Sequence, residues 1–333
     1  MLIFWILIFI ASLTLLIKGA DWFVESSERI GLALKISPFI IGVTIVAVGT
    51  SFPELASSLA AIFKEASEIV AANVIGSNIA NILLIVGLSA VVARRLAVRR
   101  SLIDIDLPLL ASTTVLFGFI LWDGKVNWQE GFLLLIAFLV YLFYTISQRG
   151  VEPEKPLPEE IVPGEIVEVL PSRIERRRVQ KSVEKLNLKV FLFLMAGALC
   201  LIVGANYLID SVLKLAEILK IGVSIITILG VAVGTSLPEL AVSVRAAAQK
   251  KYEISLGNIF GSNIFNLLVV MGLPAMIKPL LVDTITFKIG FPFMVIATIL
   301  LVISGITRRI SIWEGAMFLL IYILFVVKLF GLF

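Results

Sequence analysis

The sequence contains the same ten-residue stretch twice, once in each half of the chain. VAVGTSFPEL occupies residues 46–55, and VAVGTSLPEL occupies residues 231–240. A second pair of matching stretches follows: NVIGSNIAN at residues 73–81 and NIFGSNIFN at residues 258–266. Both pairs are separated by the same 185 positions, with no insertion between them. A constant offset over two motifs indicates an internal duplication.

The duplicated stretches lie in a chain that is too apolar for a water-soluble protein. Hydrophobic residues make up 59% of the 333 residues and charged residues 16%, whereas soluble domains carry about 25% charged residues. Ten segments are apolar over the length needed to cross a bilayer, which is about 20 residues. They are residues 1–24, 37–63, 67–93, 102–122, 127–147, 188–212, 221–248, 252–277, 282–305 and 311–332. We therefore expect an all-α integral membrane protein.

The ten segments divide into two halves of five. Residues 1–147 are predicted to form the first five-helix repeat and residues 188–333 the second. Because each half crosses the membrane an odd number of times, the second half must be inserted upside down relative to the first. The predicted fold is thus ten transmembrane helices arranged as two inverted repeats. This arrangement is typical of secondary transporters, whose substrate sites lie near the bilayer midplane between the repeats.

Residues 148–187 separate the two halves and are rich in Pro, Glu, Lys and Arg, which predicts a partly disordered linker. Lys and Arg near span ends favour the cytoplasmic side. The loops on the linker's side hold most of these residues outside the linker itself: Arg29, Lys35, Arg94, Arg95, Arg99, Arg100, Lys250, Lys251, Arg308 and Arg309. We therefore expect a multi-pass protein of the cell membrane with a cytoplasmic linker and both termini outside. The net charge of +4 follows from this orientation and does not indicate nucleic-acid binding.

The composition excludes several kinds of chemistry. Histidine is absent and Cys200 is the only cysteine, so disulfides, zinc or iron-sulfur sites and histidine proton relays are not expected. We expect no cofactor and no enzymatic activity, because two carboxylates alone make a thin catalytic set. Any bound ion must use oxygen ligands.

The duplicated motifs place their polar residues on common helix faces. Residues at spacings of three or four positions lie on one face of a helix. In the first half these faces are formed by Ala47, Thr50, Ser51 and Glu54 on one helix and by Asn73, Ser77 and Asn81 on the next. In the second half they are formed by Ala232, Thr235, Ser236 and Glu239, followed by Asn258, Ser262 and Asn266. Four helices can therefore direct hydroxyls, amides and two carboxylates toward one axis.

Each first motif also contains a proline that interrupts its helix. Pro53 and Pro238 cannot donate the helical hydrogen bond to the carbonyl of the glycine four residues earlier, Gly49 or Gly234. Free backbone carbonyls at membrane depth are tolerated where they line a cavity or are buried in protein. Such carbonyls are also good ligands for hard cations.

Glu54 and Glu239 are the residues that most clearly indicate function. A carboxylate at bilayer depth costs at least about 2.5 kcal/mol, and the chain has one at matching positions of both halves. For a single Ser, Thr or Asn in these helices, a packing role as interhelical hydrogen-bond donor is the simpler interpretation. Two carboxylates balance one divalent cation, and Ca²⁺ takes six to eight oxygen ligands, whereas Mg²⁺ requires a tighter octahedron. Sodium could use the same oxygens, so that competition for one site would produce exchange.

The motifs GTSFPE and GTSLPE, each followed by a GSN helix, resemble the two alpha repeats of the sodium/calcium exchangers, in the cation/calcium exchanger superfamily. Here these repeats correspond to residues 42–81 and 227–266, and the resemblance covers nearly the whole chain. It implies a rigid core of the second, third, seventh and eighth helices, past which the first and sixth slide. It also implies a cation site formed by Ala47, Thr50, Ser51, Glu54, Ser77, Asn81, Ala232, Thr235, Ser236, Glu239, Ser262 and Asn266, with the alanines contributing backbone carbonyls.

The sequence departs from some of these exchangers at Asn266, where they have aspartate, and the resemblance then implies that potassium is not co-transported. The leading hypothesis is a sodium/calcium antiporter, with the two cations and the lipid bilayer as partners and the monomer as the expected assembly. A proton/calcium exchanger is the alternative, although that branch usually carries GNxxE instead of GTSxPE. A passive cation channel is disfavoured by the broken, inverted helices.

Overall fold

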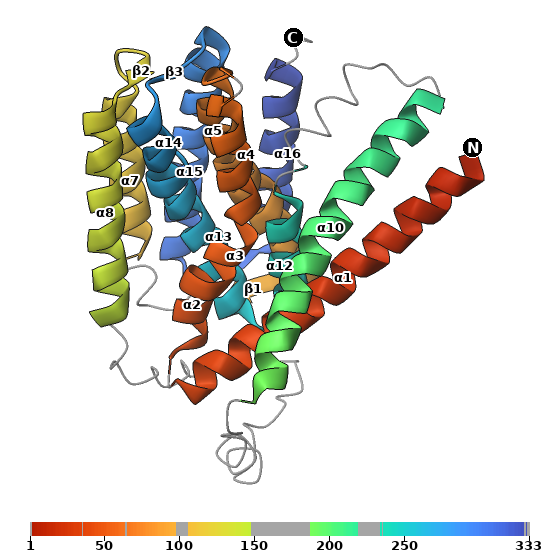
Figure 1. Ribbon diagram of the computed structural model, residues 1–333. Helices are drawn as coiled ribbons and strands as arrows, with labels where there is room; N and C mark the ends of the chain where they lie inside the picture. The colour runs from red at the N-terminus through yellow and green to blue at the C-terminus, as the bar shows by residue number, and fades with distance from the viewer. Residues whose placement is uncertain are drawn as a thin grey trace.

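The computed structural model describes residues 2–34, 36–63, 65–97, 106–147, 187–218, 234, 236–329 and 331. The described part of the chain is a bundle of helices with two short β-ribbons (Figure 1). Eight of its helices are long and apolar enough to cross a membrane: Leu2–Gly31, Pro38–Phe63, Glu68–Ala93, Trp128–Thr145, Leu188–Leu208, Tyr252–Ile277, Thr286–Ile306 and Ile312–Leu329. The protein is therefore a helical membrane protein, as the composition predicted.

The first half begins with one long helix and continues with interrupted ones. Its elements are α1 (Leu2–Ala33), α2 (Pro38–Ile41), the π-helix η1 (Gly42–Val46), α3 (Ala47–Thr50), α4 (Phe52–Phe63), α5 (Glu68–Ile79), the π-helix η2 (Ala80–Val86), α6 (Gly87–Ala93), β1 (Arg95–Ala97), α7 (Leu107–Ile120), β2 (Lys125–Val126) and α8 (Trp128–Ser147). The apolar helix α7 is shorter than a full span, and part of its predicted segment, residues 102–105, lies outside the described residues.

The second half follows the same order. Its elements are α10 (Leu188–Ile218), α12 (Leu237–Ala248), α13 (Tyr252–Phe265), the π-helix η5 (Asn266–Val270), α14 (Gly272–Ile277), β3 (Leu280–Leu281), the π-helix η6 (Thr286–Gly290), α15 (Phe291–Ile306), β4 (Arg309–Ser311) and α16 (Ile312–Leu329). Helix α12 is the end of the predicted seventh span, and residues 221–233 of that span lie outside the described residues. Nearly all of the predicted linker, residues 148–186, does so as well.

Two predicted span ends were wrong. Helix α1 continues to Ala33 rather than ending near residue 24, because its last turns carry charged residues that pair with each other and with the second half, as Arg29 does with Glu25 and Glu28 with Lys251. The ninth span begins at Thr286 rather than at residue 282. There Asp283 accepts hydrogen bonds from the backbone N–H of Ile285 and Thr286 at 2.9 and 3.0 Å, which starts the helix later.

The two β-ribbons each join one half of the chain to the other. In the first ribbon β1 pairs antiparallel with β4, with Leu96 opposite Ile310. In the second, β2 pairs antiparallel with β3, with Val126 opposite Leu280. By the offset of the duplication, β3 is the second-half equivalent of β1, and β4 is very nearly the equivalent of β2. The two ribbons therefore occupy corresponding places in the two halves. They lie toward opposite ends of the bundle (Figure 1).

The protein core lies between the interrupted helices, while α1 and α10 lie outside it. In the span Tyr252–Ile277, 89% of the most apolar window is buried, compared with 17% for Leu2–Gly31. Helices α1 and α10 run side by side and lean away from the bundle (Figure 1). They approach closely at Gly19, where an added Cβ would lie 2.8 Å from the Cys200 Cβ. Small residues thus allow close approach of the outer pair, whose backbones lie near each other at Gly19.

Candidate cation-binding site

The structure contains the predicted helix break in the first half, and the described residues of the second half show the matching helix start. Helix α3 ends at Thr50 and α4 begins at Phe52, with Ser51 between them at φ −86° and ψ 5°. In the second half Ser236 has nearly the same conformation, φ −88° and ψ 10°, at the N-cap of α12. Each break precedes a proline that has no N–H to continue the helical hydrogen bonds. The same local sequence therefore has the same backbone conformation at Ser51 and Ser236.

The two glutamates lie directly after these breaks and are fully enclosed. Glu54 is in the first turn of α4 and is 1% exposed, and Glu239 is in the first turn of α12 and is 0% exposed. The Ser51 hydroxyl donates a hydrogen bond of 2.8 Å to Glu239 Oε1, which links the break in one half to the carboxylate of the other. Glu54 and Glu239 also interact electrostatically. Two acidic groups that are 185 residues apart in the sequence therefore share one interior region.

Several polar atoms around the carboxylates have no hydrogen-bond partner among the described residues. Buried polar groups in proteins are nearly always hydrogen-bonded, and each unpaired group in a dry interior is costly. The unpaired groups in the duplicated motifs are both carboxylate oxygens of Glu54, Oε2 of Glu239, the hydroxyls of Ser236 and Ser262, the side-chain amides of Asn78, Asn81 and Asn266, and Oδ1 of Asn263. Apart from the amide nitrogens, these atoms are oxygens of the kind that hard cations prefer.

Both asparagines lie in π-helical turns that sequence periodicity did not predict. Asn81 is in η2 and Asn266 is the first residue of η5. Single π-turns within α-helices occur frequently at functional sites, because the extra residue redirects the following side chains. The spacing of four residues per step assumed a regular α-helix and so did not predict the local geometry at these two asparagines.

Asn73 and Asn258 hold the glutamate-bearing turns in position; they belong to the predicted polar helix faces but not to the twelve predicted cation ligands. Asn258 Nδ2 donates to Ser243 Oγ at 2.8 Å and to the Glu239 carbonyl at 3.5 Å, and its Oδ1 accepts from the Thr50 hydroxyl at 3.1 Å. Asn73 Nδ2 makes the matching contacts, to Ser58 Oγ at 3.2 Å and to the Glu54 carbonyl at 3.4 Å. The signal available in the sequence was their matched place one turn before Ser77 and Ser262.

Glycines allow α13 to lie directly against the first-half break. An added Cβ at Gly261 would lie 2.4 Å from the carbonyl oxygen of Val43 and 2.6 Å from the Ala47 Cβ. The carbonyl of Ala47 accepts hydrogen bonds from the Ser51 N–H at 2.9 Å and from the Thr50 hydroxyl at 3.3 Å. The predicted carbonyl ligand Ala47 is thus packed at the contact between the two halves.

Ten of the twelve predicted site residues are described, and all ten are buried. They are Ala47, Thr50, Ser51, Glu54, Ser77, Asn81, Ser236, Glu239, Ser262 and Asn266. Ala232 and Thr235 lie outside the described residues. Direct hydrogen bonds across the halves join Ser51 to Glu239 and Thr50 to Asn258. In the described part of the chain, no three or more His, Cys, Asp or Glu side chains are grouped so that they could hold a metal ion, so any cation here would depend largely on neutral oxygens.

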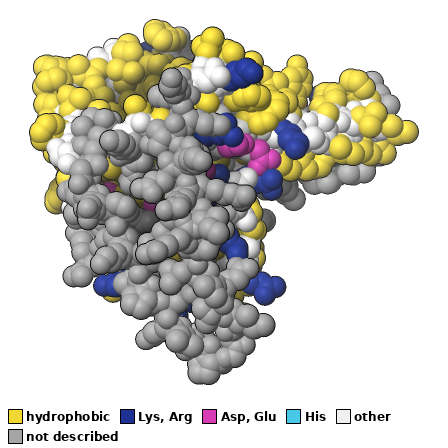
Figure 2. All heavy atoms as spheres, turned by 90° about the horizontal axis from the view of Figure 1, so that it is seen from below, with side chains coloured by type: hydrophobic (Ala, Val, Ile, Leu, Met, Phe, Trp, Pro, Cys, Tyr) yellow, Lys and Arg dark blue, Asp and Glu magenta, His cyan; other side chains and the backbone are white. Residues whose placement is uncertain are grey.

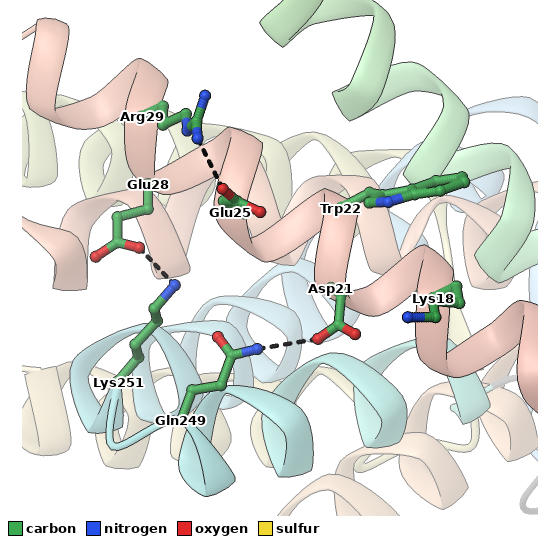
Figure 3. Close-up of a pocket in the computed structure, with 8 residues that line it drawn as sticks. All are labelled: Lys18, Asp21, Trp22, Glu25, Glu28, Arg29, Gln249 and Lys251. Atoms are coloured by element: carbon green, nitrogen blue, oxygen red, sulfur yellow. Dashed lines mark hydrogen bonds and ion pairs between the residues drawn. The ribbon is translucent and has the colours of Figure 1, made fainter. Parts of the chain in front are cut away.

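A polar cavity lies elsewhere, between α1 and the turn after α12 (Figure 3). It has a volume of about 580 Å³ and is lined by Lys18, Asp21, Trp22, Glu25, Glu28, Arg29, Gln249 and Lys251. Its charges are largely paired with each other, as in the 2.6 Å contact between Lys251 Nζ and Glu28 Oε2. This cavity has no enclosed carboxylate pair and is not the candidate cation site.

The similarity of this chain to known proteins agrees with the geometry. The family model described as sodium/calcium exchanger protein matches residues 4–147 and 189–331. The chain belongs to this family. Its members are secondary transporters and not enzymes. The two matched segments exclude residues 148–188, which contain the sequence between the two halves.

Relatives that are similar over nearly their whole length include archaeal proteins. The sodium/calcium exchanger MaX1 of Methanosarcina acetivorans is 33% identical over 97% of this chain and 98% of its own length. The inner membrane protein YrbG of Escherichia coli is 32% identical over 87% of this chain and 85% of its own length. A solved structure of the sodium-calcium exchanger NCX_Mj, soaked with Na⁺ and Sr²⁺, is 32% identical, superposes with a TM-score of 0.79, and covers 98% of this chain and 99% of its own.

Proposed function

We propose that this protein is a secondary antiporter that exchanges sodium for calcium through one site near the middle of the membrane. The observation that carries the proposal is the pair of enclosed carboxylates, Glu54 and Glu239, which come from matching positions of the two halves and are joined through Ser51. Two buried carboxylates repel each other unless a cation or a proton neutralises them. The site therefore favours a cation and can act as the point of exchange.

The twelve predicted residues supply the ligands in this proposal. Glu54 and Glu239 contribute two negative charges, which balance one Ca²⁺, and the serine, threonine and asparagine oxygens with the alanine carbonyls complete a set of the size that Ca²⁺ prefers. Sodium ions are also hard and can use the same oxygens. Because both cations need the same carboxylates, loading sodium displaces calcium. The neutral amide at Asn266 leaves the site without a third carboxylate, which argues against potassium as a co-substrate.

Alternating access would follow from two inverted five-helix repeats. The corresponding β-ribbons, the corresponding helix breaks and the matched contacts of Asn73 and Asn258 support residues 1–147 and 188–333 as these repeats. The weakly buried pair α1 and α10, which packs through Gly19 and its neighbours, is suited to slide past the core. Opening toward one side would then correspond to closing toward the other.

The names of the relatives support sodium as the counter-ion and calcium as the transported divalent ion. The orientation in this proposal has the linker in the cytoplasm and both termini outside, in the cell membrane. Figure 2 shows several Lys and Arg side chains on the lower face of the bundle, in agreement with the cytoplasmic preference of basic loops. A monomer contains both halves of the site and needs no second copy.

The deciding experiment measures calcium-45 uptake into proteoliposomes that are loaded with sodium and diluted into sodium-free buffer. The proposal predicts uptake that requires internal sodium, is independent of an imposed pH gradient, and is lost in the Glu54→Gln variant. Uptake driven by a proton gradient without sodium would instead identify a proton/calcium exchanger that uses the same carboxylates. Uptake that persists in the Glu54→Gln variant would remove the doubled motif from the mechanism.

A further inference from the structure

A second polar cavity lies beside the β1–β4 ribbon, and neither Glu54 nor Glu239 lines it. It has a volume of about 350 Å³ and is lined by Arg94, Arg95, Thr307, Arg309, Ser311 and Glu314. The ribbon places residues of distant sequence together, since Arg95 pairs with Ser311 and Ala97 with Arg309. Three guanidinium groups, from the end of α6 and the end of α15, therefore border one cavity.

The cavity has a net positive charge. Its one acidic lining residue, Glu314, is already occupied: Glu314 Oε2 accepts hydrogen bonds from the Ser311 N–H at 2.7 Å and from the Ser311 hydroxyl at 2.8 Å. Within the described ranges, Arg94, Arg95 and Arg309 form no ion pair with any carboxylate. A cluster of exposed arginines without carboxylate partners is suited to a phosphate group, which the planar guanidinium binds through two parallel hydrogen bonds.

The corresponding ribbon in the other half shows that the backbone does not require these arginines. By the offset of the duplication, the residues equivalent to Arg94, Arg95 and Arg309 are Pro279, Leu280 and Gly124, none of which is basic. The same pairing of strands thus forms without basic residues at these three positions. The preference of basic loops for the cytoplasm explains why positive charge lies on the predicted cytoplasmic side. It does not explain why arginines from two different loops line the same cavity.

A neighbouring tryptophan places the cavity at the level of lipid headgroups. Trp313 follows β4 by two residues and is 79% exposed. At the other ribbon, Trp122 and Trp128 flank β2 and are 78% and 57% exposed. Tryptophans concentrate at the two membrane interfaces, where headgroups lie. Both ribbons therefore lie near an interface, and only the β1–β4 ribbon is strongly basic.

We propose that this cavity binds the phosphate group of an anionic phospholipid from the adjacent leaflet. Arg94, Arg95 and Arg309 hold the phosphate, and the acyl chains extend along the lipid-facing surface of the neighbouring helices. Basic pockets between transmembrane helices on the cytoplasmic side are known to bind such headgroups. The lipid would contact β1 and β4 at once and so join the two halves of the chain. This inference is independent of which cations the protein exchanges.

The test uses the full-length protein, purified in detergent and stripped of lipid, and native mass spectrometry. The probes are dioleoylphosphatidylglycerol, which is anionic, dioleoylphosphatidylcholine, which is zwitterionic, and inorganic phosphate. We expect one phosphatidylglycerol to bind each chain more tightly than phosphatidylcholine. Arg95→Gln and Arg309→Gln should each weaken this binding about tenfold, because a charge-assisted hydrogen bond is lost. Arg95→Lys, which keeps the charge but loses the planar fork, should fall between the wild type and Arg95→Gln.

The matched control is Lys250→Gln, which removes one exposed positive charge from the turn between α12 and α13. It should leave phosphatidylglycerol binding unchanged. Equal weakening in Lys250→Gln and Arg309→Gln would overturn the proposal in favour of general attraction to a basic face. Equal binding of the two lipids would also overturn it. Inorganic phosphate binding as tightly as phosphatidylglycerol would identify a site for the free anion and overturn the lipid assignment. The thermal transition of each variant serves to verify folding.

Discussion

Ser51 of the first half donates a 2.8 Å hydrogen bond to the carboxylate of Glu239 in the second. Both residues are fully buried, and both belong to the copied motif. The bond fixes a hydroxyl oxygen beside one carboxylate oxygen while the other, Oε2, has no hydrogen-bond partner among the described residues. The helix break at Ser51 in the first half thus contacts the carboxylate of the second half directly.

Removal of this hydroxyl should weaken calcium binding. In Ser51→Ala the Glu239 carboxylate loses a charged hydrogen bond, worth about 1.5 to 3 kcal/mol, and the site loses one of its proposed ligands. We expect the calcium concentration for half-maximal uptake to rise about tenfold or more. Sodium-driven calcium-45 uptake at a series of calcium concentrations measures this. Ser147→Ala, which removes an exposed hydroxyl bonded within α8, should leave the value unchanged; a similar rise in that variant would contradict the assignment.

Calcium should stabilise the folded protein, and the effect should depend on both carboxylates. A ligand at one hundred times its dissociation constant stabilises the state that binds it by about 2.7 kcal/mol. We expect the melting temperature to rise on addition of calcium and to return when a chelator removes it. Glu54→Gln and Glu239→Gln should each abolish the rise while melting no lower than the ion-free wild type, because a buried amide is less costly than a buried charge. A calcium-dependent rise that survives in both variants would place the ion elsewhere.

Substitution of Gly261 should damage the contact between α13 and the first-half break. The new methyl group of Gly261→Ala would lie 2.4 Å from the backbone oxygen of Val43, which cannot rotate away. Overpacking of this kind costs about 1 to 3 kcal/mol, so we expect a lower melting temperature and reduced uptake. The equivalent first-half residue, Gly76, is the control, since an added Cβ there meets no atom within 4 Å. Equal effects of Gly76→Ala and Gly261→Ala on melting temperature and uptake would show that the contact of Gly261 with Val43 does not cause them.

Acid should selectively remove the contribution of Asp283 to the stability of the folded protein. Asp283 lies at the start of the helix η6, just outside the membrane span. Partial burial alone would raise the pKa of Asp283, but hydrogen bonds from Thr286 and from the backbone of Ile285 outweigh it and lower the pKa. A carboxylate with a depressed folded-state pKa stabilises the protein above its unfolded value of about 3.9, and this is lost as the pH falls through the folded value. The stability difference between wild type and Asp283→Asn should therefore shrink below about pH 4.

The melting temperatures of the two proteins across an acidic pH series give this difference. Thr286→Val, which removes one of the donors to Asp283, should reduce the difference at neutral pH. A difference that stays constant through the acidic range would contradict a role for the ionised carboxylate.

The sequence was sufficient to predict the elements that depend on long apolar runs. The spans expected at residues 67–93 and 252–277 are Glu68–Ala93 and Tyr252–Ile277 in the structure. Both runs are bounded by charged residues, which fix where burial stops. The helix breaks were also predictable, because proline lacks an N–H in any context.

The remaining features depend on contacts that no local pattern contains. Strands of two or three residues, such as β2 and β4, are too short for alternation to be visible. The π-turns at Asn81 and Asn266 are adjustments of the backbone within sequences that read as regular helix. The contact of Asn258 with Thr50 joins residues 208 positions apart. The extension of α1 to Ala33 likewise depends on partners more than 200 residues away.

The ion pair between Asp21 of α1 and Arg245 of α12 should tie the outer helix to the core at one end only. Asp21 accepts hydrogen bonds from Arg245, including one of 3.1 Å from Nη2, and from Gln249 Nε2 at 2.9 Å (Figure 3 draws the Gln249 contact). At the equivalent positions of the other half, α10 has Asn206 and α4 has Ala60, which cannot form an ion pair. Under alternating access, a sliding α1 would have to break this contact, whereas α10 cannot form the equivalent ion pair at Asn206.

We therefore expect Asp21→Asn to lower the melting temperature slightly and to change the balance between the two access states. Partly exposed ion pairs contribute about 0.2 to 1 kcal/mol, less at high salt. A double-mutant cycle with Arg245→Gln should give a coupling energy in that range, and 0.5 M salt should reduce it. Exchange rates in the two directions, measured with inside-out and right-side-out vesicles, should change unequally in Asp21→Asn. Equal changes in both directions, or no coupling in the cycle, would mean that the pair lies on the surface without restraining α1. Glu25→Gln, which breaks a pair within α1 itself, is the matched control.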